Sequence, residues 1–399
     1  MWCRLKKVLS LSAILVGLCP SVHANTTASA NPLSLLAQTD LATPPFSPIP
    51  DVVPPALPPA RIALLLPLRS ATLSYAANAV RAGFLAAYER DRDGVAVEVV
   101  ETGDTEQDVV PSYIAAAEQH DIVVGPLSRS DVTAVAQSGA VNKPTIALTP
   151  VDSADDAGVK LPGQMLTVGL SIEDESRQVA AWARSNKKNG KAFVLATGTA
   201  WQVRAAKAFA AQWQKLGGEM EAFEMAAFNG YLSAKSLSDL KRLIETDEPA
   251  LLFAALDARQ ARQLRIAVGN QVPLYGTSQL NPFTLGNGSE TERSAELNGA
   301  RLLDIPWQLQ PDHPAVMVYP RPVVSVDQRR SADLERLYAL GIDAYRVARE
   351  IALKRFSFEM DGVTGKLTVR FDNAGSSFAR AEQRATYQDG GVTAILDKR

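Results

Sequence analysis

Strands and helices that alternate between Arg61 and Pro150 constrain the fold of this chain more than any other feature. The segment opens with the apolar run Ile62–Leu66, continues into an amphipathic helix, and repeats this order up to Thr145–Leu148. A continuous apolar run of strand length is typical of a strand buried on both faces. We therefore predict an α/β fold with an open parallel sheet, in which binding groups gather at the carboxyl ends of the strands.

The same alternation continues from Met165 to Gly276, which gives more strands than one sheet of ordinary size holds. We predict two lobes, each a mostly parallel sheet flanked by helices. The expected boundaries of the folded part, residues 61–399, are 61–168 and 277–355 for lobe 1, and 169–276 and 356–399 for lobe 2. The tail that begins GKLTVRFD alternates apolar and polar residues, as antiparallel strands do.

Residues 1–24 have the pattern of a secretory signal peptide, with basic residues, a short apolar run and small residues before Ala24. Export to the periplasm is therefore expected. An alternative is processing at Cys19, where the preceding residues resemble a lipobox, although Leu18 stands where a small residue is usual. Lipidation of Cys19 would tether the chain to the outer membrane. Both cysteines of the chain, Cys3 and Cys19, lie in this segment, so we expect no disulfide.

Residues 25–60 are rich in proline, with eight prolines between Pro44 and Pro59. Proline supplies no backbone N–H to a sheet and favours extended polyproline geometry. We predict a disordered linker with two interpretations. It is a spacer that holds the domain away from a membrane or partner, or a leader without function.

Composition and motifs indicate a binding protein without a catalytic set. The formal net charge of -2 argues against a nucleic-acid binder. The sequence lacks a G-x-S-x-G elbow, a P-loop, H-E-x-x-H and a G-x-G-x-x-G after a strand. We therefore predict that the protein is not an enzyme and that it uses no cofactor and no metal. His120, at a predicted helix end, and His313, in a loop, are interpreted as structural residues.

Five residues at strand ends are the candidate ligand-binding groups. Ser70 follows the first strand, while Gly125, Ser128 and Ser130 follow the third and Thr149 follows the fourth. Backbone N–H groups and hydroxyls at such a helix start can hold a carboxylate or another anion. The simpler interpretation is that Ser128 or Ser130 only caps the following helix. We keep ligand contact as the second interpretation.

The segments that contain these residues also resemble a known family. RIALLLPLRS, AVRAGFLAAY, VVGPLSRSDV, PTIALTP, ELNGARLLDIPWQL, LERLYALGIDAYRVA and DGVTGKLTV occur in this order from Arg61 onwards. Together they resemble the LppC/LpoA-like family of penicillin-binding protein activators. The resemblance implies a type I periplasmic binding protein fold, the fold of the branched-chain amino-acid binding proteins. In amino-acid binders of this fold, the positions that match Ser128 and Thr149 grip the carboxylate of the ligand.

The resemblance also implies a function. We expect a non-enzymatic periplasmic regulator that binds and stimulates a peptidoglycan synthase, a bifunctional penicillin-binding protein. The best-studied activator carries a large helical-repeat domain before this one, where the present sequence has the proline-rich linker. The alternative is a solute-binding protein of an ABC transporter, in which an amino acid or a similar small ligand closes the two lobes.

Overall fold

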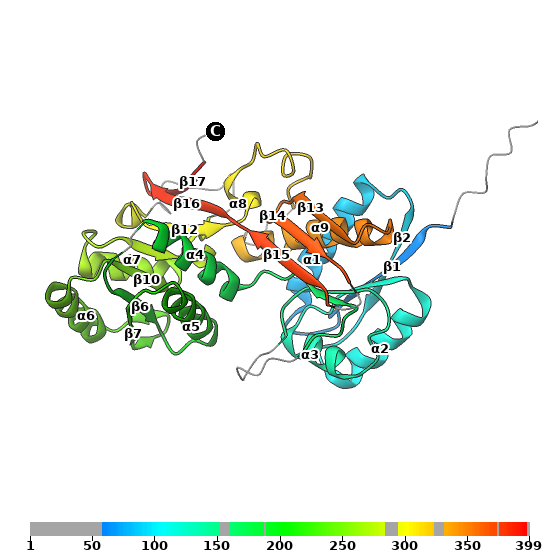
Figure 1. Ribbon diagram of the computed structural model, residues 1–399, viewed down its shortest axis with the longest axis horizontal. Coiled ribbons are helices and arrows are strands. Elements are labelled where there is room, and N and C mark those ends of the chain that lie inside the picture. The colour runs from blue at the N-terminus through cyan, green and yellow to red at the C-terminus, as the bar shows by residue number, and fades with distance from the viewer. Residues whose placement is uncertain are drawn as a thin grey trace, which may run out of the picture. The chain divides into compact units, whose positions relative to one another are not determined.

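The computed structural model describes residues 58–151, 160–186, 189–283, 294–322, 331–372 and 375–396 (Figure 1). The predicted signal peptide, Cys19 and all but the last three residues of the linker lie outside these residues. The last linker residue, Ala60, is the first residue of strand β1.

A five-stranded parallel sheet forms the first lobe, in the order β2-β1-β3-β4-β5. One face packs on helices α2 and α3, and the other packs on α1 and α9. Because both faces are covered, β1 and β3 contain continuous buried apolar runs, whereas the edge strand β2 includes two glutamates. The elements are β1 (Ala60–Leu66), α1 (Ser74–Arg90), β2 (Val95–Glu101), α2 (Glu106–Gln119), β3 (Ile122–Val124), α3 (Arg129–Gln137), β4 (Thr145–Ala147), β5 (Met165–Thr167) and α9 (Ala332–Ala352).

A seven-stranded sheet forms the second lobe, in the order β17-β16-β12-β11-β10-β6-β7. Helices α4 and α5 cover one face, and α6 and α7 cover the other. Its elements are α4 (Ile172–Asn186), β6 (Ala192–Ala196), α5 (Ala200–Lys215), β7 (Met220–Glu224), α6 (Ala234–Asp247), β10 (Leu251–Ala255), α7 (Ala258–Val268), β11 (Leu274–Gly276), β12 (Arg301–Asp304), β16 (Gln383–Gln388) and β17 (Gly391–Ala394). The strands β12 to β7 are parallel, and β16 and β17 continue the sheet antiparallel.

The remaining described elements are smaller. A three-stranded antiparallel sheet contains β13 (Ser357–Asp361), β14 (Lys366–Arg370) and β15 (Ser377–Ala381). A hairpin contains β8 (Ala227–Phe228) and β9 (Tyr231–Leu232), and the short helices are α8 (Pro306–Leu309), η1 (Ser278–Leu280) and η3 (Ala295–Leu297). β15 leads directly into β16, so this strand pair carries the chain from the small sheet to the seven-stranded sheet (Figure 1).

Two glycines allow α1 and α9 to pack backbone against backbone. A Cβ atom on Gly83 would lie 1.8 Å from the carbonyl oxygen of Tyr338, and one on Gly341 would lie 2.1 Å from that of Val80. Any side chain at either position would force the two helices apart. The final long helix is therefore part of the core of the first lobe.

The predicted fold class is confirmed, but the lobe boundaries differ from those we predicted. We placed residues 277–355 in lobe 1, yet β12 lies in the sheet of lobe 2, because it pairs with β11 and β16. We placed residues 356–399 in lobe 2, yet β13 to β15 pack their apolar side chains, including Leu367 and Val369, into the core of lobe 1. Alternation indicated β14, in the segment GKLTVRFD, without indicating which core it joins.

Candidate functional site

Gly125 ends β3 in a backbone conformation that requires glycine. Its φ is +123°, and a Cβ atom there would lie 2.1 Å from the carbonyl oxygen of Leu65. Its N–H donates to the carbonyl oxygen of Ile146 at 2.8 Å, and Leu148 N–H donates to that of Pro126 at 2.9 Å. Gly125 therefore lets the ends of β1, β3 and β4 come close together.

The hydroxyl of Ser128 has the capping role that we considered first. Its Oγ accepts the Asp131 N–H at 3.2 Å, so Ser128 is the N-cap of α3. The Oγ of Ser130 lies 3.0 Å from that of Ser128. Thr149 follows β4 and is half-buried. It packs against Gly169, where a Cβ atom would lie only 2.5 Å from the Cα atom of Thr149. The structure thus places these residues at two neighbouring strand ends.

Ser70 is engaged within its own loop. The side chain is buried, and its hydroxyl donates to the carboxylate of Asp104. The same oxygen accepts the N–H groups of Thr72 at 3.2 Å and Leu73 at 3.0 Å. Because these contacts use the hydroxyl fully, Ser70 is poorly placed to bind a ligand.

A carboxylate from the chain itself lies at these strand ends. Arg129, the first residue of α3, donates from Nη2 to both oxygens of Glu173 at 3.0 Å. Arg204 of α5 donates from Nε to Glu173 Oε1 at 2.9 Å, and the hydroxyl of Ser171 donates to Oε2 at 3.1 Å. We call Arg129, Ser171, Glu173 and Arg204 the strand-end cluster. Sequence reasoning missed it, because its two arginines lie far from Glu173 along the chain.

The partners of Glu173 keep it ionised. Burial raises the pKa of this carboxyl, but the guanidinium groups of Arg129 and Arg204, together with hydrogen bonds from its own N–H and from Ser171, outweigh burial. The net pKa lies below the ordinary value for glutamate. The cluster therefore already contains the anion that its cations attract.

A second charged cluster is buried where the chain passes between the two large sheets. Arg336 of α9 donates to both oxygens of Asp304, at 3.0 and 2.7 Å, and to the carbonyl oxygens of Ser278 and Asn281. Glu175 accepts the Ser278 N–H at 2.9 Å. The remaining two members are Arg380, which donates to the carbonyl oxygens of Val168 and Gly169 at 2.7 and 2.8 Å, and Glu382. We call Glu175, Asp304, Arg336, Arg380 and Glu382 the crossing cluster.

The crossing cluster contains three carboxyl groups and two guanidinium groups. Burial raises the pKa of Glu175 to about 7, although the hydrogen bonds from Ser278 act against this shift. Burial also raises the pKa of Glu382 well above its ordinary value, and it lowers that of Arg380. Glu382 Oε2 is buried without a hydrogen-bond partner. The excess of acids means that part of the cluster retains a proton near neutral pH.

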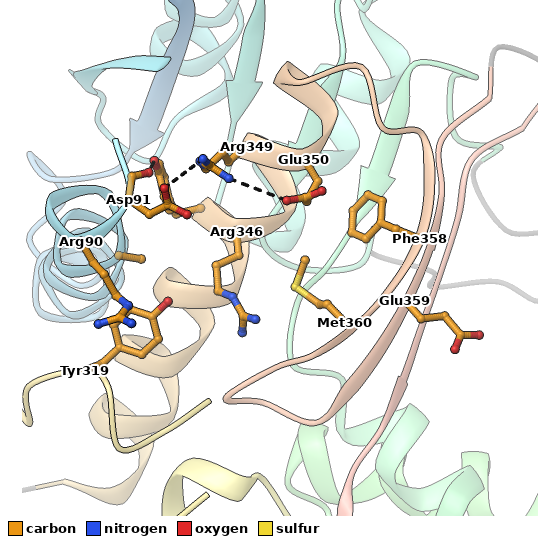
Figure 2. A pocket seen from close by; sticks show the side chains of 11 residues that line it. Arg90, Asp91, Tyr319, Arg346, Arg349, Glu350, Phe358, Glu359 and Met360 are labelled. Carbon is orange, nitrogen blue, oxygen red and sulfur yellow. Dashed lines mark hydrogen bonds and ion pairs between the residues drawn. The ribbon is translucent and has the colours of Figure 1, made fainter. Parts of the chain in front are cut away.

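A cavity of about 300 Å³ lies where the ends of α1 and α9 meet β13 (Figure 2). Its lining combines apolar groups such as Phe358 and Met360 with three arginines, Arg90, Arg346 and Arg349. These cations already have partners. Arg349 binds Asp91 at 2.9 Å, Arg346 binds Asp343 at 3.1 Å, and Arg90 donates to a backbone carbonyl at 3.4 Å. Two of the three arginines are therefore ion-paired, whereas Arg90 contacts only a neutral carbonyl oxygen and the ring of Tyr319.

Both histidines considered in the sequence have structural contacts. The ring of His120 contacts the carbonyl oxygen of Ala116 at 2.9 Å and Glu98 at 3.1 Å, at the end of α2. His313 Nδ1 accepts the Ala315 N–H at 3.2 Å. Within the described ranges, no three acidic, histidine or cysteine side chains are grouped as a metal ion would require. None of the helices described there has the length and apolarity needed to cross a bilayer.

Comparison with known proteins places this architecture in a family. The family model described as "LppC putative lipoprotein" matches residues 56–390. The chain belongs to the LppC family. A penicillin-binding protein activator LpoA from Photobacterium profundum is 25% identical over 340 residues, which cover 77% of this chain and 53% of that protein. The chain thus spans about half the length of the curated LpoA relatives that it matches.

Solved structures confirm the fold as that of type I periplasmic binding proteins. A Chromobacterium violaceum protein described as a "putative branched-chain amino acid ABC transporter" is 34% identical, with a TM-score of 0.65, over 82% of this chain and 100% of its own. The LpoA C-domain from Haemophilus influenzae, a regulator of PBP1A, is 21% identical, with a TM-score of 0.65, over 84% of this chain and 100% of its own. The LppC-type chain therefore has structural relatives with two different described roles.

Proposed function

We propose that this chain is a non-enzymatic envelope protein that binds and stimulates a peptidoglycan synthase of the bifunctional penicillin-binding protein class. The single observation that carries the proposal is the strand-end cluster. In a solute-binding protein of this fold, the strand ends of the first lobe are where a carboxylate ligand would be held. Here Glu173 satisfies Arg129 and Arg204 at that place.

Competition with Glu173 would weaken the binding of any free carboxylate to Arg129 and Arg204. A hydrogen bond to a charged group contributes roughly 1.5–3 kcal/mol, and Glu173 makes several of them. A solute would have to displace an attached carboxylate that is present at high effective concentration. Ser70 and Ser128 add no free hydroxyl for it, since both are committed to capping and loop contacts. A domain of this design is better suited to a protein partner than to a small acid.

Contact with the synthase would take place on the periplasmic side of the envelope. The signal-peptide pattern supports export, and the proline-rich linker would give the domain reach. If Cys19 is acylated, the linker would tether the domain to the outer membrane. Intact-mass measurement of the mature chain distinguishes a start at Asn25 from a start at an acylated Cys19.

The proposal is tested by reconstitution. Purified protein is added to a bifunctional penicillin-binding protein from the same cells, and the rate of glycan polymerisation is measured. We expect the rate to rise with a saturable dependence on protein concentration. In parallel, amino acids and small carboxylates should leave the melting temperature unchanged, because a ligand that binds the native state must raise it. A clear thermal shift with a free solute, without any change in synthase rate, would overturn the proposal.

A second candidate is a solute-binding protein of an ABC transporter. It is favoured by the 34% identity to the whole length of the Chromobacterium violaceum protein. Under this alternative, Glu173 would swing away from Arg129 when a ligand arrives. The melting experiment then gives a shift for one amino acid or related acid, and the Arg129→Met variant loses that shift.

A further inference from the structure

Strand β7 forms an open edge of the seven-stranded sheet. On its paired side, the carbonyl oxygen of Glu219 accepts the Ala192 N–H at 2.9 Å, and Met225 N–H donates to the Ala196 carbonyl at 2.7 Å. Backbone groups alternate in direction along a strand. Glu219 and Met225 are an even number of residues apart and both bond to β6, so every second residue from Glu219 points toward β6. Ala222 belongs to the other set, and its N–H and C=O groups therefore point away from β6. Those of Met220 and Glu224 do the same.

An apolar groove of about 320 Å³ lies beside this edge, between β7 and α5. Its floor includes Val194 and Ala222, which are paired neighbours on β6 and β7 and therefore point to the same face. Its wall includes Ala206 and Ala210 of α5. Because these alanines are small, the groove can accept an apolar side chain. A strand added beside β7 would direct alternate side chains toward it.

The edge carries an excess of glutamates, although Lys207 lines the groove together with Glu224. Glu219, Glu221 and Glu224 lie on or next to β7, and Lys191 pairs with Glu221 at 3.1 Å. Across the part of the chain that the structure describes, Glu219 and Glu224 form no ion pair within 4.0 Å. Lysine, proline or a bulge usually blocks an exposed edge against pairing. Here the strand is regular, and its charge would repel a second acidic edge while attracting a basic one.

Exposed aromatic residues also lie on the hairpin that follows β7, which contacts α7 on the other face of the sheet from the groove. Phe228 and Tyr231 are 79% and 53% exposed, and they are paired across the hairpin of β8 and β9. Asn229 and Gly230 form its turn, with φ values of 50° and 78°, which suits a tight hairpin. Two aromatic side chains held on a hairpin are typical of a protein contact.

We propose that the β7 edge, with the groove beside α5, is a docking surface for an extended basic segment of another protein, which pairs with β7 as an added strand. Backbone pairing would provide the affinity, and the groove and the glutamates would select an apolar residue flanked by basic ones. The charge argument excludes a symmetric contact with a second copy, since two acidic edges would meet. This inference does not depend on the identity of the partner as a synthase.

The experiment uses the full mature chain and a fluorescent, acetylated and amidated peptide of alternating arginine and valine as the probe. Ala222→Pro removes only the outward N–H, because Ala222 does not donate to β6, and proline is tolerated at such an edge. Glu219→Arg reverses an exposed charge on the face opposite the groove, where the arginines of a peptide with its valines in the groove would lie. We expect each variant to lose affinity by at least about tenfold, equivalent to about 1.4 kcal/mol. Glu245→Arg, an exposed glutamate on α6, is the matched control and should bind normally.

Several outcomes would overturn the inference. One is an unchanged affinity in Glu219→Arg, the variant that keeps the strand intact if Ala222→Pro fails to fold. Another is equal binding of a glutamate–valine peptide, or of an arginine–valine peptide whose backbone nitrogens are methylated on the pairing side. The inference also fails if light scattering finds a dimer of the chain that Ala222→Pro dissociates, because β7 would then bind a second copy.

Discussion

Two glutamates, Glu173 and Glu175, stand two positions apart in the first turn of α4, and their carboxyl groups behave in opposite ways. The pKa of Glu173 is lowered, while that of Glu175 is raised to about 7. Both share the same helix start, so the helix dipole does not distinguish them. The difference comes from the partners that the tertiary fold brings. Two arginines meet one carboxylate in the strand-end cluster, whereas three carboxyl groups share two arginines in the crossing cluster.

The strand-end cluster is saturated, because its one carboxylate has two guanidinium partners. The crossing cluster is under-compensated, because its carboxyl groups outnumber its guanidinium groups. A saturated cluster holds its members in one arrangement over a wide range of pH. An under-compensated one must bind or release a proton when pH changes, and this couples its stability to pH. The crossing cluster lies where the chain passes between the sheets, so this coupling affects the connection of the lobes.

The largest expected effect comes from removing the central cation of the crossing cluster. Arg336→Met leaves the buried carboxylate of Asp304 without its cationic partner, although Asn281 and the Ile305 N–H still donate to it, and such a loss typically destabilises a protein by about 3–5 kcal/mol. Urea unfolding at pH 7 measures the change in the free energy of unfolding. Arg370→Met, at an exposed position on β14, is the control and should change it by less than about 0.5 kcal/mol. A loss below about 1 kcal/mol in Arg336→Met would show that Asp304 is not isolated by the substitution.

The second effect depends on pH. Because the folded-state pKa of Glu175 is raised, the folded protein binds more protons than the unfolded chain between about pH 4.5 and 7, so wild-type stability falls as pH rises through this window. Glu175→Gln keeps an oxygen for the Ser278 N–H and removes the charge. We expect the variant to gain on the order of 2 kcal/mol relative to wild type at pH 8, with little change at pH 4.5. Parallel loss at both pH values would contradict the proposed proton linkage.

The third effect has the opposite sign. Glu173 has a lowered folded-state pKa, so its contribution is present above the unfolded value of about 4.5 and is lost as pH falls through the lower folded value. Glu173→Gln should therefore destabilise the protein by about 1–2 kcal/mol at pH 7 and much less at pH 3. Thermal melts across this range measure it, with Glu245→Gln as the exposed control. Added acetate should partly restore Glu173→Ala and leave wild type unchanged.

The smallest effect separates the helix start from the charge partners. Ser171 Oγ accepts the Asp174 N–H at 3.2 Å and donates to Glu173, whereas the carboxyl group of Glu175 accepts from Ser278. Ser171→Ala should cost about 1 kcal/mol through the lost N-cap. Carboxyl titration by NMR should find the pKa of Glu173 raised and that of Glu175 unmoved. A matching shift of both groups would mean that the helix start controls them together.

The sequence predicted the fold well wherever local chemistry decides an element. The sequence predicts a helix over 258–268, and α7 lies there, with a capping box of Asp257 and Gln260 at its start and Gly269 after its last turn. By contrast, the sequence predicts a helix from Val110 with Pro111 in its first turn, whereas α2 begins at Glu106, so Pro111 lies inside the helix. β12 was not predicted, since its four residues become a strand only through pairing with β11 and β16.

The sequence located the strand ends but not the charged groups that gather beside them. Strand-end reasoning led to Gly125, Ser128 and Thr149, and Ser128 has the capping role considered first. The decisive carboxylate was not found, because Glu173 follows the first lobe's last strand and meets Arg129 only in three dimensions. A serine followed by acidic residues indicates a helix start, and this pattern gives no information about a cation elsewhere in the chain.

The glycine contact between α1 and α9 has a consequence for the order in which the chain is made. α1 is among the first elements to be synthesised, whereas α9 follows all the parallel strands of the second lobe. Since Gly83 and Gly341 fix these helices against each other, the first lobe lacks part of its core until synthesis is nearly complete. Long sequence separation between contacting elements slows folding. Under the proposed envelope location, a chain that stays open for so long would still be able to pass through a translocation channel before it folds.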